Sequence, residues 1–273
     1  MTDLLDLEFL FVTGKGGVGK TTVAAAIAEV AARRGQRVLV CEMDAKGALA
    51  TAFELSELQF EPTEVEPNLF AMSMSTEDSL REYLRLFVKI PFIGRIGPLA
   101  STFDFVADAA PGVKEILAVG KLAWEVKERH YDLVVVDTPP SVHALDILDA
   151  PDKMSEFFGS RLLRWLIAPY GSRMVQLAAR PFLSVAERVL GGPFLSEITE
   201  FFWLFSKLQD RFAARLRVVR RQLADPSTRY LVVSTPEAIP SQRADALVAE
   251  LDRRGLHAAL RLVNRAWDDE LAE

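Results

Sequence analysis

The stretch that decides the fold is GKGGVGKTT at residues 14–22, which follows the apolar run EFLFVT at 8–13 and precedes VAAAIAEVAARR at 23–34. It satisfies the pattern G-x-x-x-x-G-K-[ST], in which a glycine-rich loop joins a strand to a helix and its backbone N–H groups surround phosphates. The dipole of the following helix also favours an anion at this position. The sequence therefore predicts a phosphate-binding loop. The alternative, a glycine-rich turn that only begins a helix, does not require the complete motif.

Each residue of this loop has an expected task. We expect Lys20 to reach the β- and γ-phosphates of a nucleotide and to act in catalysis, and the Thr21 hydroxyl to take a place on Mg²⁺. The other members are expected to line the phosphates, mainly through backbone N–H groups: Gly14, Gly16, Gly17, Val18, Gly19 and Thr22.

Two carboxylates stand near the ends of predicted strands. Asp137 ends LVVVD and begins DTPPSVHAL, and Asp44 follows the strand in VLVCEMDAKGAL. A carboxylate at the carboxyl end of a parallel strand is well placed to hold Mg²⁺ through water, which is the role expected of Asp137. An ordinary strand-ending aspartate is the alternative. Asp44 is expected to orient the attacking water or to accept its proton.

Short β-rich runs alternate with longer helical stretches, which is typical of a mostly parallel sheet with helices on both faces. Strands are predicted at 8–13, 37–41, 69–74, 133–137, 230–234 and 259–264. We therefore expect an α/β fold, a doubly wound mostly parallel sheet of the P-loop NTPase class, as a single domain over residues 1–273. A helical insertion is expected at 145–225, with breaks at 169–171 and 191–193.

Composition excludes several classes of protein. Of the 273 residues, 50% are hydrophobic and 26% are charged, so the chain has enough apolar material for a core. The net charge of −6 does not attract polyanions, and no nucleic-acid partner is expected. A single cysteine, Cys41, excludes an internal disulfide framework. A reducing cytoplasm is the expected location of a chain with so little cysteine, and the acidic N-terminal segment lacks the features of a signal peptide.

Lys15, the second lysine inside the loop, makes the motif resemble the deviant Walker A (SIMIBI) class of P-loop ATPases. This class includes the arsenite-pump ATPase ArsA, the tail-anchored-protein targeting ATPases, the partitioning and MinD-type ATPases and the nitrogenase iron protein. In that class the equivalent lysine crosses a dimer interface to the nucleotide of the other subunit. The resemblance implies a dimer with two ATP molecules at its interface and a catalytic Lys15 that acts in trans. A solvated loop lysine is the alternative.

Three further segments narrow the resemblance to the ArsA-like and tail-anchored-targeting-like branch. The switch positions that match this branch are Asp44, Leu49 and Phe53 in switch I, and Asp137, Pro140, His143 and Leu145 in switch II. The late segment VVSTPEAIPSQRADALVAELDRRGLHAALRLVNR, residues 232–265, is also similar. The resemblance implies that Asn264 recognises adenine, and that the partner subunit is a second copy or a related ATPase, giving a homodimer or a heterodimer.

The chain also departs from this family's pattern. Ala45 and Gly47 stand where switch I usually has Pro and His, and Val142 replaces the Gly before the switch II histidine. A β-branched residue is a stiffer pivot than glycine, so we expect altered movement. The arsenite-binding cysteines and the CxxC zinc clasp have no counterpart. A second interpretation is therefore a nucleotide-binding regulatory or scaffold subunit with little hydrolysis of its own. A third, a P-loop kinase of small molecules, is disfavoured by Lys15.

The insertion contains one apolar helix face. Its residues recur every three or four positions: Phe201, Leu204, Phe205, Leu208, Phe212, Leu216, Val219 and Leu223. The opposite face carries Lys207, Arg211, Arg215 and Arg220. A core helix with a solvated basic face explains this pattern. The alternative, by analogy with related ATPases, is a groove for a hydrophobic or membrane-protein client, to which Trp165 and Trp203 would contribute.

Overall fold

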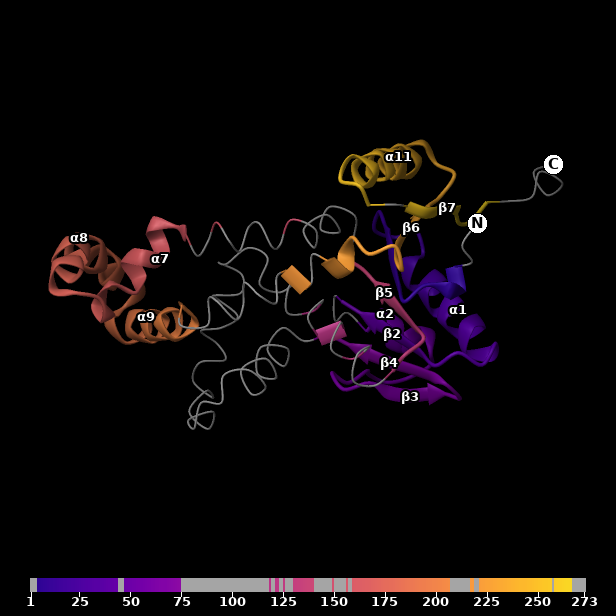
Figure 1. The fold of residues 1–273 in the computed structure, drawn as a ribbon, viewed down its shortest axis with the longest axis horizontal. Coiled ribbons are helices and arrows are strands. Elements are labelled where there is room, and N and C mark those ends of the chain that lie inside the picture. The colour runs from indigo at the N-terminus through magenta and orange to yellow at the C-terminus, as the bar shows by residue number, and fades with distance from the viewer. Residues whose placement is uncertain are drawn as a thin grey trace. The chain divides into compact units, whose positions relative to one another are not determined.

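The computed structural model describes residues 4–43, 47–74, 130–139, 159–206, 221–256 and 258–266, together with positions 118, 121, 122, 125, 149, 156, 217 and 218. The chain divides into two compact units (Figure 1). The first unit comprises residues 1–75, 118–148 and 219–273, and the second comprises 76–117 and 149–218. The phosphate loop belongs to the first unit.

A seven-stranded sheet forms the first unit, with the order β3-β4-β2-β5-β1-β6-β7. Its strands are β1 (Phe9–Gly14), β2 (Val38–Glu42), β3 (Thr63–Glu66), β4 (Leu69–Ser73), β5 (Leu133–Asp137), β6 (Thr228–Ser234) and β7 (Ala258–Val263). Neighbouring strands pair in parallel, except that β3 is antiparallel to β4. The α/β prediction is thereby confirmed, and every predicted strand end lies within two residues of its observed position.

Strand β3 was not predicted, and its composition explains why. Its sequence TEVE is polar and mostly exposed, because the strand lies at one edge of the sheet and pairs only with β4. A strand that is not buried on both faces lacks the continuous apolar run that identifies the central strands.

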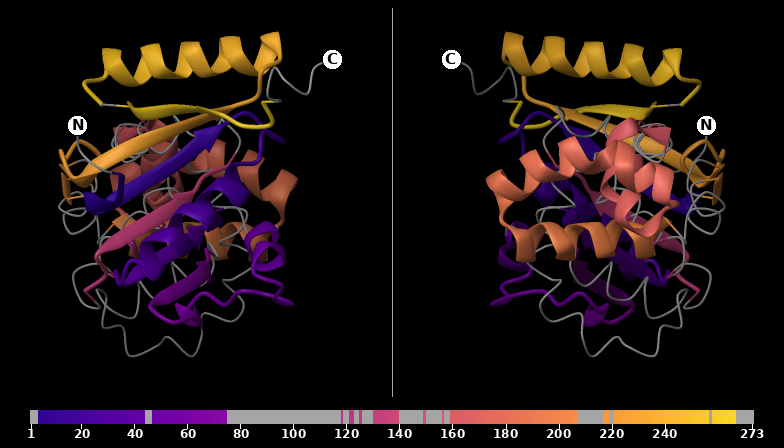
Figure 2. Two further views of the ribbon diagram at one scale, coloured as in Figure 1. Left: turned by 90° about the vertical axis from the view of Figure 1, so that its right-hand side faces the viewer. Right: turned by 90° about the vertical axis from the view of Figure 1, so that its left-hand side faces the viewer.

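Helices of the first unit are η1 (Leu4–Asp6), α1 (Lys20–Arg33), α2 (Ala48–Ala52) and α11 (Ala238–Arg253). On one face of the sheet, alternate residues of β1, β2 and β5 pack with the alanines of α1, such as Ala24 and Ala28. On the other face, Phe9, Phe11 and their counterparts on β5 and β6 pack with Leu247 of α11. Figure 2 shows α11, in yellow-orange, lying along β7. Helices on both faces explain why the central strands are continuously apolar.

The described part of the second unit is helical. It contains α7 (Arg161–Leu166), η3 (Ala168–Tyr170), α8 (Arg173–Leu190) and α9 (Gly192–Ser206). The predicted breaks are confirmed, because η3 separates α7 from α8 and Gly191, with φ +81°, separates α8 from α9. Aromatic pairs join these helices: Trp165 with Phe182 at 5.1 Å between ring centroids, and Tyr170 stacked on Trp203 at 4.7 Å. Within the described residues, none of the helices has the length and apolar composition needed to cross a membrane.

Candidate functional site

The loop between β1 and α1 depends on backbone conformations that glycine supplies. Gly17 and Gly19 have φ angles of +83° and +92°, in the left-handed region. Gly14 has a φ of +151°, and a Cβ atom there would lie 2.1 Å from the carbonyl oxygen of Val233 on β6. Glycines therefore allow the chain to leave β1, turn and enter α1 at Lys20, as the motif predicts.

The side chain of Lys20 contacts the backbone of this loop. It is the first residue of α1, it is buried, and its Nζ donates a hydrogen bond to the backbone oxygen of Lys15 at 3.3 Å. The ammonium group therefore bends back over the loop. This places a positive charge where the predicted phosphates would bind.

Thr21 and Asp137 meet at the carboxyl end of the sheet. The Thr21 hydroxyl donates to Oδ2 of Asp137 at 2.6 Å, although the two residues are 116 positions apart. Asp137 is the last residue of β5, next to β1, and is buried. A hydroxyl and a carboxylate in contact are the oxygen donors that Mg²⁺ takes beside nucleotide phosphates, so these two residues fit the predicted metal.

A third buried side chain at this edge, Glu42, was missed by sequence reasoning. Glu42 ends β2 directly opposite Asp137 on β5 and is 3% exposed. Because side chains alternate along a strand, Glu42 shares the α1 face of the sheet with Val38 and Val40.

The two carboxylate oxygens of Glu42 differ in their contacts. Oε1 accepts a hydrogen bond from the Ala48 N–H at 3.0 Å, at the start of α2. Oε2 is buried and has no hydrogen-bond partner among the described residues. The signal in the sequence was an acidic residue at the end of a fully apolar strand.

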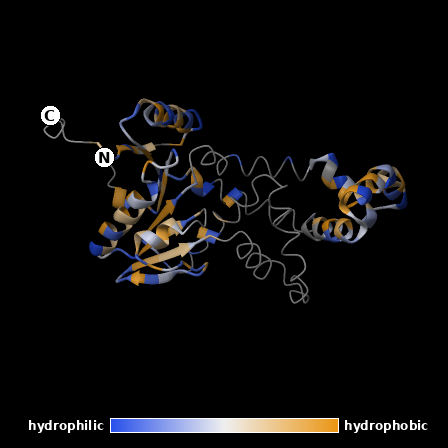
Figure 3. Ribbon diagram, turned by 180° about the vertical axis from the view of Figure 1, so that it is seen from behind, coloured by the Kyte–Doolittle hydropathy of each residue, from blue (hydrophilic) through white to orange (hydrophobic). Residues whose placement is uncertain are grey.

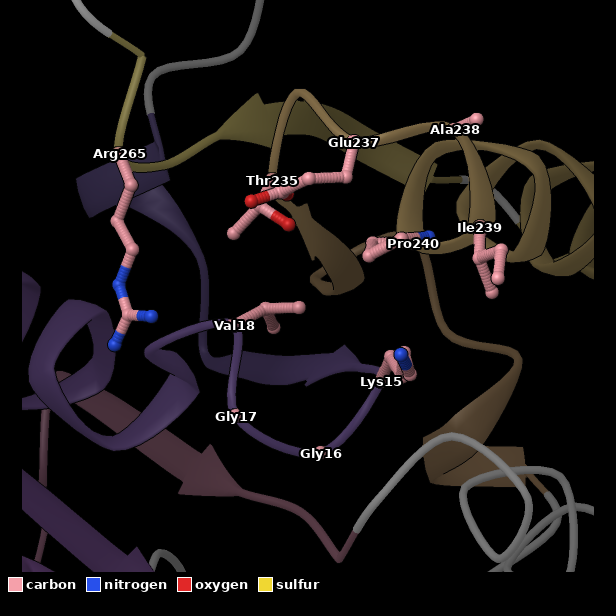
Figure 4. Close-up of a pocket in the computed structure, with 10 residues that line it drawn as sticks. All are labelled: Lys15, Gly16, Gly17, Val18, Thr235, Glu237, Ala238, Ile239, Pro240 and Arg265. Atoms are coloured by element: carbon pink, nitrogen blue, oxygen red, sulfur yellow. The ribbon is translucent and has the colours of Figure 1, made fainter.

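A cavity of about 500 Å³ lies beside the phosphate loop. Its described lining comes from the loop and from the segments that follow β6 and β7: Lys15, Gly16, Gly17, Val18, Thr235, Glu237, Ala238, Ile239, Pro240 and Arg265 (Figure 4). Hydrogen bonds from the Thr235 side chain and a backbone N–H lower the pKa of Glu237, and the positive charges of Arg265 and Lys15 lower it further. The cavity wall thus combines two cations, an ionised carboxylate and an apolar section.

Asn264 lies against the loop at the end of β7. Its Nδ2 donates to the Val18 carbonyl at 2.9 Å, and its Oδ1 accepts from the Arg265 N–H at 2.9 Å. A Cβ atom on Gly19 would be 2.3 Å from Nδ2, so glycine at that position also makes room for this contact. The structure therefore places the residue predicted to recognise adenine at the phosphate loop.

The structure brings together the loop, Lys15, Lys20, Thr21, Asp137 and Asn264. Of the other switch positions, Leu49 is buried in α2, and Phe53 packs on the same core. Predicted residues that lie outside the described residues are Asp44, Ala45, Pro140, Val142, His143, Leu145, Lys207, Leu208, Arg211, Phe212, Arg215, Leu216, Val219 and Arg220.

Comparison with known proteins confirms the resemblance seen in the sequence. A family model for anion-transporting ATPases matches residues 7–273. A protein of Aquifex aeolicus named for an arsenical pump-driving ATPase is 28% identical over 264 residues, which is 95% of this chain and 80% of that protein. The ATPase ASNA1 homolog of Cryptosporidium parvum is 29% identical over 271 residues, covering 96% of this chain and 66% of that protein.

A shorter match is found with the ATPase BagA of Mycobacterium tuberculosis, which is 31% identical over 156 residues. That match covers 53% of this chain and 46% of BagA, so it spans about half the length of the mycobacterial relative. The family model, in contrast, extends from the start of β1 through Asn264 and includes the whole loop. The chain therefore belongs to the anion-transporting ATPase family.

Proposed function

We propose that this chain hydrolyses Mg²⁺-bound ATP at a dimer interface, and that hydrolysis drives a conformational cycle that acts on a client or partner in the cytoplasm. The observation that carries this proposal is the 2.6 Å hydrogen bond between Thr21 and Asp137. It joins the phosphate loop to the strand-ending carboxylate that is expected to hold Mg²⁺. Family membership supports the same activity.

The chain's own residues would divide the work as follows. The loop N–H groups and Lys20 bind the phosphates, and Lys20 is held over the loop by its contact with the Lys15 carbonyl. Thr21 and Asp137 hold Mg²⁺, which neutralises charge on the β- and γ-phosphate oxygens when bound. Asp44 orients the attacking water, a role that rests on the family resemblance.

The position of the Lys15 side chain is an argument for the proposed dimer. Lys20 already supplies the ammonium group inside the loop, whereas the side chain of Lys15 lines the cavity outside it (Figure 4). A lysine in that place is available to a nucleotide bound by a facing subunit. A cation supplied in trans stabilises charge on the transferring phosphoryl group.

Two variants test this proposal. Lys20→Ala should abolish ATP binding measured by calorimetry, whereas Lys15→Ala should bind ATP normally. In ultracentrifugation with a non-hydrolysable ATP analogue, wild type should dimerise and Lys15→Ala should not. Unchanged affinity in Lys20→Ala would overturn the proposed nucleotide site, and equal dimerisation of wild type and Lys15→Ala would overturn the trans role.

A second candidate function is a nucleotide-binding subunit with little hydrolysis of its own. Gly47 favours it, because it stands where the family usually has histidine and has a left-handed φ of +73°. Turnover by the isolated chain separates the two functions. A rate no higher than that of Lys20→Ala would select the regulatory subunit.

The exposed face of α8 supports a hydrophobic client. Met174, Leu177, Val185 and Val189 are 81%, 59%, 61% and 76% exposed, and their spacing places them on one side of the helix. Exposed apolar side chains gathered in this way mark interaction surfaces, and Figure 3 shows apolar segments on this helix. The double variant Leu177→Glu and Val185→Glu should lose the ability to keep a transmembrane peptide soluble. Undiminished protection by that variant would exclude this face.

A further inference from the structure

The phosphate loop has two different sides. In the sheet, β1 lies between β5 and β6. The Thr21–Asp137 contact lies on the β5 side, whereas the cavity is lined by segments that follow β6 and β7. If the metal end of a nucleoside triphosphate is at Asp137, its base therefore extends toward the cavity. This step rests on the proposed function.

The described cavity wall contains one side chain suited to stacking on a base. Its ten described lining residues include no aromatic ring, and the group among them that stacks on aromatic faces is the guanidinium of Arg265. Figure 4 shows Arg265 at one end of the lining, with Ile239 and Pro240 at the other. A planar base placed here meets apolar groups on one side and a guanidinium on the other. Guanidinium groups stack on aromatic faces, including those of bases.

The backbone of Arg265 is fixed by its conformation and by hydrogen bonds. Its φ is +56°, a conformation that is uncommon for residues other than glycine and is often found at functional sites. The Arg265 N–H donates to Asn264 Oδ1, and Asn264 in turn donates to the Val18 carbonyl. The backbone N–H of Asn264 also donates to the Ser234 carbonyl at 2.8 Å. Arg265 is thus tied through Asn264 to both the loop and β6.

We propose that Arg265 stacks on the base of the bound nucleotide and that Asn264 is the residue that positions it. Stacking contacts the face of a base, so Arg265 provides affinity for purine nucleotides without distinguishing adenine from guanine. Asn264 retains a second amide hydrogen and a second oxygen lone pair, which remain for a contact with the edge of the base. Arg265 therefore contributes affinity, and any choice between bases is left to Asn264.

Inorganic triphosphate, which has no base, is the probe that separates stacking from charge. Calorimetry should compare ATP, GTP and triphosphate, each with Mg²⁺, on wild type and Arg265→Ala. Stacking on one base is worth about a tenfold change in affinity. We expect Arg265→Ala to bind ATP and GTP about tenfold more weakly and to bind triphosphate as wild type does. Arg265→Lys should not restore affinity, because lysine keeps the charge but has no plane.

Two further variants complete the test. Arg253→Ala is the matched control, since Arg253 is an exposed arginine at the end of α11 whose loss changes the net charge equally. It should leave all three affinities unchanged. Asn264→Ala should weaken ATP but not triphosphate. Adding Arg265→Ala should cause little further loss, because the stacking by Arg265 depends on its hydrogen bond with Asn264 and is already lost in Asn264→Ala.

Four results would overturn the inference. An equal loss of affinity for triphosphate in Arg265→Ala would show that Arg265 acts on phosphates through its charge. Unchanged ATP affinity in that variant, or full rescue by Arg265→Lys, would exclude stacking. If wild type binds triphosphate but not ATP, the base site fails while the phosphate loop stands. If it binds neither ligand, the proposed function itself fails.

Discussion

Replacing Gly14 by alanine tests whether β6 limits the start of the phosphate loop. Gly14 is the last residue of β1 and pairs with Val233 on β6. A Cβ atom there would lie 2.1 Å from the Val233 carbonyl oxygen and 3.1 Å from its carbonyl carbon. Both atoms belong to the backbone of a buried central strand, so no side-chain rotation relieves the overlap. An ordinary contact between these atoms is about 3.5 Å long, so β1 and β6 would have to separate by about 1.4 Å to accommodate the added carbon.

The magnitude follows from two costs. Alanine at a positive φ of this kind costs about 1–2 kcal/mol in backbone strain. Forcing an extra carbon into a packed position costs about 1–3 kcal/mol more. Gly17→Ala is the matched control, because Gly17 also has a positive φ, +83°, but has no atom within 4 Å of the added carbon. It should therefore lose only the strain contribution, about 1–2 kcal/mol.

Hydrogen exchange with mass spectrometry is the suitable assay. Two compact units need not unfold together, so a single denaturation midpoint does not report one free energy. Exchange in peptides covering β1 and β6 reports the opening free energy of those strands directly. Gly14→Ala should lower that free energy by about 2–5 kcal/mol, and Gly17→Ala by less. An equal loss in both variants would show that β6 imposes no packing limit at Gly14.

Three other predictions follow from buried contacts at the same edge. Glu42→Ala should increase hydrogen exchange at the Ala48 amide, because the amide loses its acceptor. Glu42→Gln keeps an oxygen acceptor and should not increase this exchange. Similar exchange in both variants would contradict the assigned contact. Thr21→Val should raise the Mg²⁺ concentration needed for half-maximal turnover by about tenfold, and it should leave the affinity for metal-free ATP unchanged. An unchanged Mg²⁺ requirement would show that Thr21 is not part of the metal site. Burial, with the nearby Asp137 and Glu42 carboxylates, raises the pKa of the Cys41 thiol, so native protein at pH 8 should resist iodoacetamide until it unfolds. Rapid labelling of folded protein would refute that burial.

The central sheet was predictable because its strands have a simple physical signature. Residues such as Val134, Val135 and Val136 are buried whichever face they point to, so the run LVVVD stands out in the sequence. The loop was predictable for a different reason. Gly14, Gly17 and Gly19 each meet a local requirement for a positive φ or for close approach, and local requirements leave a local pattern in the sequence.

Glu42 and the exposed strand β3 show where this reasoning ends. A carboxylate at a strand end looks the same in the sequence whether it faces solvent or, like Glu42, is 3% exposed and accepts the N–H of a following helix. Its burial depends on β5 pairing beside β2, a contact between segments about ninety residues apart. Pairing partners far along the chain leave no mark on the four or five residues around each strand end.

The same limit applies to what supports the phosphate loop. The motif predicts the loop's shape, but the contacts that hold it come from strands on either side of β1. Asp137 on β5 binds Thr21, and Asn264 after β7, which lies beyond β6 in the sheet, binds the Val18 carbonyl, 246 residues away. Because these supports lie on opposite sides, the two ends of a bound nucleotide depend on different parts of the chain. A change at β7 should therefore alter binding of the base with an intact motif, while a change at β5 should alter the metal end alone.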